Sequence, residues 1–254
     1  MTATRRPRVE KRKQATRLRL MEAAYALMAE TGGPEVSIQE ITTAADVGFG
    51  TFYTYFASKE AIYNALVEEV LEASGKVVDA ATRHLIDPAE RLSAGLQYTL
   101  LQARADPLWG KFLSSSLMRP ASAANGLGKF FLRDVFDGLA QKRFKVDDVP
   151  MSVVAIVGTL HAMLRVERGE LQMALGNLAQ GHAADRAAAK DDMDLPRRTT
   201  ALILRVLGIS PEESVALVYK PLPPISGFAR FFNGDSAASE EAPTSAPDSS
   251  ESGG

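Results

Sequence analysis

A run of hydroxyl, aromatic and basic side chains occupies the stretch from Phe49 to Lys59. Thr51 can hydrogen-bond the edge of a nucleic-acid base or touch a thymine methyl group. Lys59 carries a point charge that suits a phosphate. The stretch is therefore a candidate for contact with DNA, provided that the surrounding elements hold these side chains on one surface.

Two short helices joined by a tight turn are expected to carry the stretch. Ser37 is the predicted N-cap of the first helix, because the glutamate three residues later completes a capping box. Residues 46–48 follow as a turn, since Asp and Gly tolerate backbone angles that β-branched residues resist. A second helix is expected over residues 49–56, with Phe52 and Phe56 facing inward. This is the helix-turn-helix pattern, whose second helix enters the DNA major groove.

Spacing alone fits two small core helices with aromatic packing residues equally well, and a longer resemblance favours the DNA-binding interpretation. From Thr16 to about Val67 the chain closely resembles the DNA-binding region of the TetR (tetracycline-repressor) family of bacterial transcriptional regulators. The residues that carry the resemblance are Leu20, Ala24, Leu27, Met28, Gly32, the segment 37–45 and the run GTFYTYFASKEAI from Gly50 to Ile62. It implies an all-α fold with an N-terminal three-helix DNA-binding domain.

The resemblance also implies roles for nine residues. Positions that touch the DNA backbone or adjacent bases are matched by Ser37 and Gln39. Groove-facing positions are matched by Phe49, Gly50, Thr51 and Thr54. Positions that commonly reach phosphates are matched by Tyr53, Tyr55 and Lys59.

Two residues depart from the family pattern. Many members have Gly in the turn and a polar or basic residue at the start of the recognition helix, where this chain has Asp46 and Phe49. An aromatic ring cannot read a hydrogen-bonding pattern, so Phe49 is expected to contact a thymine methyl group. DNA shape and phosphate contacts are then expected to contribute more to recognition than base hydrogen bonds.

The sequence carries no pattern typical of catalysis or metal binding. It has no cysteine, which excludes disulfides and thiolate sites, and its three histidines lie far apart with no HExxH motif. GxSxG, P-loop and dinucleotide-binding motifs are also missing. Paired acids at 147–148 and 191–192 lie in polar stretches typical of solvated surface. We expect neither an enzyme nor a cofactor or metal.

Composition indicates a globular protein with charged ends. Of 254 residues, 46% are hydrophobic and 24% charged. Residues 1–19 carry eight Lys or Arg and one Glu, whereas residues 233–254 carry five acids and no base. No apolar run is long enough to cross a bilayer and no apolar segment follows the basic start, so a cytoplasmic protein without membrane contact is expected.

Four regions are predicted along the chain. They are a basic disordered arm (1–15), the helix-turn-helix DNA-binding domain (16–60), a helical ligand-binding and dimerisation domain (61–232) and a disordered acidic tail (233–254). Later helices are expected over 59–84, 88–105, 107–118, 123–143, 151–168, 195–207 and 210–219, with 182–194 as a loop. The helix at 151–168 is apolar nearly all round, and Gly158 would admit a partner helix. By the resemblance, this helix and the one at 195–207 pair in a homodimer.

An apolar cavity between the later helices is expected to bind a small apolar or aromatic effector. Its candidate lining residues are Tyr98, Trp109, Phe112, Met118, Phe130, Phe131, His161 and Met163. Aromatic and Met residues at helical spacing more often form plain core, and His161 is more typical of a satisfied core or interface histidine than of a ligand contact.

Three functions remain open at this point. The resemblance favours a ligand-responsive regulator, and in this family most often a repressor that leaves its DNA operator when an effector binds. A DNA-binding protein without an effector is the first alternative. The second is a helical small-molecule binding protein or enzyme that has lost DNA binding, which Phe49 keeps open.

Overall fold

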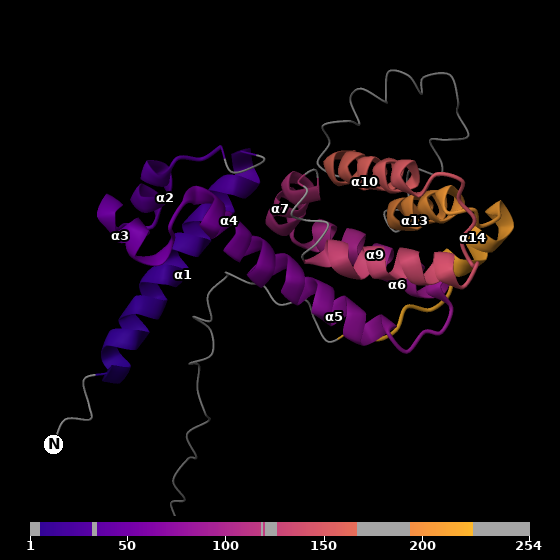
Figure 1. Ribbon diagram of the computed structural model, residues 1–254, viewed down its shortest axis with the longest axis horizontal. Helices are drawn as coiled ribbons and strands as arrows, with labels where there is room; N and C mark the ends of the chain where they lie inside the picture. The colour runs from indigo at the N-terminus through magenta and orange to yellow at the C-terminus, as the bar shows by residue number, and fades with distance from the viewer. Residues whose placement is uncertain (1–5, 32–34, 118, 120–125, 167–193, 226–254) are drawn as a thin grey trace, which may run out of the picture.

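The computed structural model describes residues 6–31, 35–117, 119, 126–166 and 194–225 (Figure 1). Within these ranges every regular element is a helix, which confirms the predicted all-α class. No helix in the described part of the chain is long and apolar enough to cross a membrane.

Four helices form an N-terminal head, on the left in Figure 1. They are α1 (Arg6–Thr31), α2 (Ile38–Ala44), α3 (Phe49–Tyr55) and α4 (Lys59–Leu66). Leu20, Met28, Ile41, Phe52 and Ile62 are fully buried in its core. Each helix of the head contributes at least one of these side chains, so hydrophobic burial fixes α2 and α3 against α1 and α4.

Helix α1 begins earlier than the sequence predicts. Residues 6–15, expected to be a disordered arm, are helical. Pro7 lies in the first turn, where proline is tolerated, and Lys, Arg and Gln in the following turns have good helix propensity. Lys11, Arg12 and Lys13 are exposed along this extension.

The local signals for the helix-turn-helix are confirmed. The Ser37 hydroxyl accepts a hydrogen bond from the Glu40 backbone N–H at 3.1 Å, and the Ser37 backbone N–H donates to Glu40 Oε2 at 2.7 Å. Asp46 has a φ of +51°, a left-handed conformation that aspartate tolerates better than most residues. Phe52 and Phe56 both face inward, with 0% and 6% of their surface exposed.

The long helix predicted over 59–84 is present but irregular. It consists of α4, a π-helical turn η1 (Val67–Glu72) and α5 (Ala73–Thr82), and Ser58 caps its start by accepting from the Ala61 N–H. Figure 1 shows this chain of helices running from the head into the second part of the molecule. Nothing in the residue spacing distinguishes the π turn from ordinary helix.

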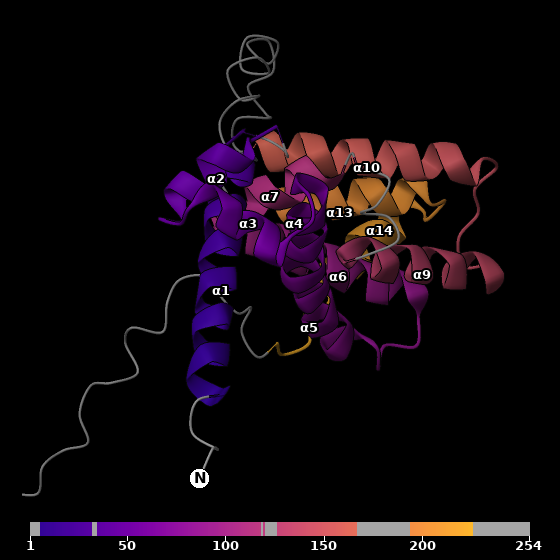
Figure 2. The same ribbon diagram turned by 60° about the vertical axis from the view of Figure 1, so that its left-hand side comes forward.

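The second part of the molecule is a helical body on the right in Figure 1. Besides α5 it contains α6 (Pro88–Ala105), α7 (Pro107–Leu117), α9 (Leu127–Ala140), α10 (Val149–Val166), α13 (Asp194–Val206) and α14 (Pro211–Val218). The predicted terminators act as expected, since Gly208 has a φ of +83° and Ser210 caps α14. Helices α10 and α13 pack side by side, as Figures 1 and 2 both show.

The head and the body are joined by buried contacts to α7. The Tyr25 ring from α1 meets Phe112 edge-on with ring centroids 5.1 Å apart. The Tyr63 hydroxyl from α4 donates to Ser116 Oγ at 2.9 Å, and both residues are buried. These contacts couple the position of α4 to that of α7.

Some predicted features lie outside the described residues. They are Met118, the start of the basic arm at 1–5, the stretch 182–193 and the acidic tail at 233–254.

Candidate functional site

Helix α3 presents one side to the core and the other to solvent. Phe52 anchors it, while Phe49 and Tyr53 have 49% and 54% of their surface exposed. Gly50 and Thr54 are exposed as well. A short helix held by one buried phenylalanine, with polar and aromatic groups outside, has the form of a DNA-reading helix.

The exposed aromatic residues of α3 contact one another. The Phe49 and Tyr53 rings pack edge-to-face with centroids 5.8 Å apart. Tyr53 also packs edge-on against the buried Phe52 at 5.6 Å. Phe49 and Phe52 thus limit the orientation of the exposed Tyr53 ring.

The other candidate DNA contacts lie around this helix with varied exposure. Thr51, Tyr55 and Lys59 are half-buried, whereas Gln39 is exposed at the start of α2. The Ser37 hydroxyl is occupied locally, because it also donates to Glu40 Oε2 at 2.6 Å. These hydrogen bonds from Ser37 lower the pKa of Glu40.

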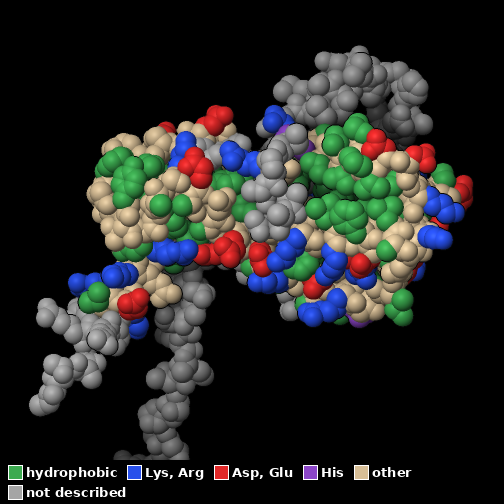
Figure 3. Space-filling view, viewed as in Figure 1, with side chains coloured by type: hydrophobic (Ala, Val, Ile, Leu, Met, Phe, Trp, Pro, Cys, Tyr) green, Lys and Arg blue, Asp and Glu red, His purple; other side chains and the backbone are tan. Residues whose placement is uncertain are grey.

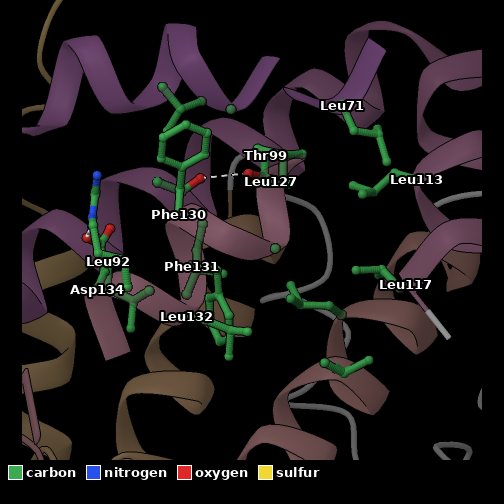
Figure 4. Close-up of a pocket in the computed structure, with 18 of the residues that line it drawn as sticks. Leu71, Leu92, Thr99, Leu113, Leu117, Leu127, Phe130, Phe131, Leu132 and Asp134 are labelled. Atoms are coloured by element: carbon green, nitrogen blue, oxygen red, sulfur yellow. Dashed lines mark hydrogen bonds and ion pairs between the residues drawn. The ribbon is translucent and has the colours of Figure 1, made fainter. Parts of the chain in front are cut away.

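A cavity of about 130 Å³ lies in the body between η1, α5, α6, α7, α9 and α10. Most of its wall is aliphatic or aromatic, including Leu71, Leu92, Leu113, Leu117, Phe130 and Phe131. Figure 4 shows Leu71, Leu113 and Leu117 on one side of the view and Asp134 on the other. The cavity is thus mostly apolar, with charged groups gathered at one end.

Gly75 on α5 makes room for an aromatic ring in this wall. A Cβ atom at position 75 would lie 2.7 Å from two ring carbons of Phe130. Only glycine therefore allows α5 and α9 to approach this closely with the ring in its present place.

The polar end is a network of charged side chains. Arg133 donates from Nη1 to Asp79 at 2.6 Å and from Nη2 to Asp134 at 2.7 Å. Arg91, behind the wall, donates to Asp134 at 2.8 Å and to Asp137 at 2.7 Å. Burial raises the pKa of Asp134, and hydrogen bonds and charges from Arg133 and Arg91 oppose that rise.

The cavity wall differs from the set of residues expected from sequence. Phe130 and Phe131 lie in the wall. Trp109 and Phe112 instead fill the core beside α5 and α1, and Trp109 Nε1 donates to Ser74 Oγ at 3.1 Å. The Tyr98 hydroxyl donates to the Pro223 carbonyl oxygen. These three residues are committed to packing on other faces of their helices.

Two further candidates lie on α10 outside the wall. His161 Nδ1 lies 3.0 Å from the Ser114 carbonyl oxygen and 3.3 Å from Ser114 Oγ, so the ring joins α10 to α7. Met163 is half-buried and is not part of the wall. The structure therefore places His161 in the satisfied-histidine role that sequence analysis had left open.

Sequence reasoning missed the polar end of the cavity. Asp79, Arg91 and Asp134 come from three helices, and the paired residues are 43 or more positions apart in the chain. Only the adjacent Arg133 and Asp134 are visible as a pair in the sequence, and such pairs are common on solvated helix faces.

The fold and the exposed α3 define a helix-turn-helix regulatory protein, and two family models agree. Residues 20–66 match the model of bacterial regulatory proteins of the TetR family, and residues 87–219 match the tetracyclin repressor-like C-terminal domain. The second match alone covers more than half of the chain. The chain belongs to the TetR family of transcriptional regulators, which is a family of DNA-binding proteins and not of enzymes.

Individual relatives support the assignment. Over 89 aligned positions, this chain is 30% identical to the uncharacterized HTH-type transcriptional regulator Rv1255c of Mycobacterium tuberculosis. The alignment covers 35% of this chain and 44% of that protein. The chain thus matches less than half the length of that relative. A crystal structure of RolR in complex with resorcinol is similar to this chain, with 30% sequence identity and a TM-score of 0.59. The similarity covers 85% of this chain and 100% of the RolR chain.

A more distant structure shares the fold. The regulator FadR from Bacillus subtilis, solved in complex with stearoyl-CoA, is 20% identical with a TM-score of 0.52 and covers 76% of this chain and 98% of its own. At this identity the likeness concerns the fold alone.

Proposed function

We propose that this protein is a dimeric repressor that binds an operator through α3 and leaves it when a small apolar or aromatic effector enters the body cavity. The observation that carries the proposal is the exposed face of α3. Its exposed residues are Phe49, Gly50, Tyr53 and Thr54, and Phe52 on the opposite side is buried in the core of the head. Those groups suit contact with base edges, thymine methyls and phosphates.

The start of α1 supports DNA binding outside the recognition helix. Lys11, Arg12 and Lys13 are exposed. Clustered cations near a DNA-reading helix add affinity through phosphate contacts, largely independently of sequence. A protein with this task acts where the DNA is, which places it in the cytoplasm.

Dimer formation is supported by the outer side of α10 and α13. Met151 and Val154 on α10 are 60% and 61% exposed, and Leu202 on α13 is 48% exposed. Figure 3 shows hydrophobic side chains gathered over α10 and the neighbouring helices. A Cβ atom at Gly158 would meet nothing within 4 Å, so the outer side of α10 also offers an open place for a second helix. Large exposed apolar surfaces typically mark interfaces.

An effector role for the cavity is supported by its position and by RolR. The wall residue Ser116 accepts a hydrogen bond from Tyr63, which belongs to the helix that follows α3. RolR, whose structure was solved with the small aromatic molecule resorcinol, is similar over most of this chain. An effector can bind more tightly to a conformation in which the two heads of the dimer do not match the spacing of the operator half-sites. Such an effector lowers operator affinity without touching DNA.

The test is binding to the DNA upstream of the protein's own gene, with random duplex as the control. Tight binding to the upstream DNA, weakened by small aromatic compounds, supports the whole proposal. Equal binding to both duplexes contradicts operator recognition. Specific binding that no small molecule alters leaves a DNA-binding protein without an effector.

A further inference from the structure

The hydroxyl groups in the described part of the cavity wall already donate hydrogen bonds within the protein. The hydroxyl of Thr82 donates to the Val78 carbonyl at 2.9 Å, that of Thr99 to Gly95 at 2.8 Å and that of Ser116 to Phe112 at 2.8 Å. Each of these carbonyl groups lies four residues earlier on the same helix. The three hydroxyl groups therefore turn their lone pairs, and not their protons, toward other partners.

The guanidinium group of Arg133, which lies in the described part of the wall, is also engaged. All three nitrogen atoms of Arg133 donate to carboxylates, Nη1 to Asp79 and Nε and Nη2 to Asp134. A ligand carboxylate or phosphate would have to compete with two aspartates for that cation. The wall thus disfavours an anionic ligand.

The carboxylates keep acceptor capacity. Asp134 Oδ1 accepts from Arg91 and Arg133, while Asp134 Oδ2 accepts no hydrogen bond from the described residues. Asp79 likewise accepts from Arg133 at Oδ1 only, among the described residues. Their side chains are 9% and 16% exposed, so water satisfies these lone pairs less well than at an open surface. An additional donor at this end of the cavity would stabilise both carboxylates.

The size of the cavity limits what can supply that donor. About 130 Å³ is close to the roughly 150 Å³ of an apolar protein cavity that holds benzene. Phe130 and Phe131 line the cavity and suit an aromatic ring. An ammonium group attached through a methylene, as in benzylamine, would also donate, but removing its full charge from water costs more than burying a neutral hydroxyl group.

We propose that the effector is a small neutral aromatic compound whose hydroxyl groups donate to the free carboxylate oxygens of Asp79 and Asp134, with its ring against the apolar wall. The inference rests on the effector role proposed above and names the chemical class of that effector. Donor groups on the ligand then meet acceptors in the wall, and the ring fills the space beside Phe130 and Phe131.

The test is calorimetric titration of the full-length protein, without DNA, with phenol, the three benzenediols, toluene, benzoate and benzylamine. Phenol or a benzenediol is expected to bind at least tenfold more tightly than the other three, because toluene lacks the donor and the remaining two carry charge. Toluene, benzoate or benzylamine binding as tightly as the best phenolic compound would overturn the inference, as would no binding by any phenolic compound.

Variants separate the proposed contact from general damage. Asp79→Asn and Asp134→Asn are each expected to weaken phenolic binding about tenfold or more, the size of one charge-assisted hydrogen bond. Asp137→Asn is the matched control, since Asp137 also pairs with Arg91 but lies outside the cavity wall. Unchanged phenolic affinity in Asp79→Asn would overturn the inference even if the more buried Asp134→Asn failed to fold.

DNA titrations of the same samples distinguish the two proposals. Phenolic binding that leaves operator affinity unchanged supports this ligand class and contradicts the effector role. Specific operator binding without any phenolic binding contradicts this ligand class and leaves operator recognition intact.

Discussion

Thr51 and Tyr53 lie two residues apart on α3, yet the resemblance gives them different partners on DNA. Thr51 matches a base-reading position and Tyr53 a phosphate-contacting one. Thr51→Ala is expected to cost about 1–3 kcal/mol at one operator position and to relax the preference there. Tyr53→Phe is expected to weaken binding to all DNA by about 0.5–1.5 kcal/mol, the net size of one hydrogen bond.

The measurement is a titration of each variant against operator, single-base operator variants and random duplex at fixed salt. Thr43→Ala is the control, because Thr43 is an exposed threonine on α2 without a proposed DNA contact. If Thr51→Ala leaves every base preference intact, α3 does not read its site through that side chain.

Gly75 leaves the space that the Phe130 ring occupies in the cavity wall. Gly75→Ala would force the Phe130 ring out of its place, since the added Cβ would lie 2.7 Å from the ring. We expect weaker effector binding and a loss of about 1–3 kcal/mol in the free energy of unfolding, which is typical of overpacking. Calorimetry and denaturant unfolding measure the two effects.

Gly95→Ala is the matched control, because a Cβ there would make an ordinary contact at 3.6 Å with Val78. Both glycines line the cavity. Equal loss of effector affinity in the two variants would contradict a specific role for the position of Phe130.

At the scale of elements, local signals in the sequence were sufficient for helix ends and insufficient for long-range pairs. The capping box at Ser37 and Glu40 and the stop at Gly208 depend on residues within a few positions, so pattern reasoning found them. The π turn at Val67–Glu72 and the pairing of Asp79 with Arg133 depend on packing between distant helices. The sequence therefore predicted the helix-turn-helix well and the lining of the cavity only at Phe130 and Phe131.

The link between α4 and α7 is expected to transmit effector binding from the cavity to the head. The buried hydrogen bond from Tyr63 to Ser116 joins the helix after α3 to the cavity wall. Tyr63→Phe is expected to cost about 0.5–1.5 kcal/mol of stability and to reduce the factor by which the effector weakens operator binding.

The double variant Tyr63→Phe with Ser116→Ala tests whether that hydrogen bond carries the coupling. Effector-dependent operator binding of both single variants and the double variant forms a double-mutant cycle. If the two single effects simply add, the bond itself is not part of the coupling.

At the scale of the molecule, Gly158 tests the proposed dimer. Gly158→Leu is expected to leave the protomer folded, since the space beyond Gly158 is open, and to weaken dimerisation by about 1–3 kcal/mol through overpacking between subunits. Operator affinity is expected to fall with it, because two heads read two half-sites together.

Sedimentation measures the fraction of dimer. Ala80→Leu is the control, because it introduces the same side chain at an exposed position of α5. A wild-type chain that is monomeric at micromolar concentration while binding its operator tightly would rule out this assembly.

If effector and operator act on one conformational equilibrium, each must weaken the binding of the other by the same factor. The affinity of a phenolic effector is measured calorimetrically for the free protein and for its saturated operator complex. We expect weaker effector binding to the complex, by the same factor by which the effector lowers operator affinity, typically about 5- to 150-fold. Equal effector affinity for free and operator-bound protein would show that effector binding in the cavity does not control operator binding.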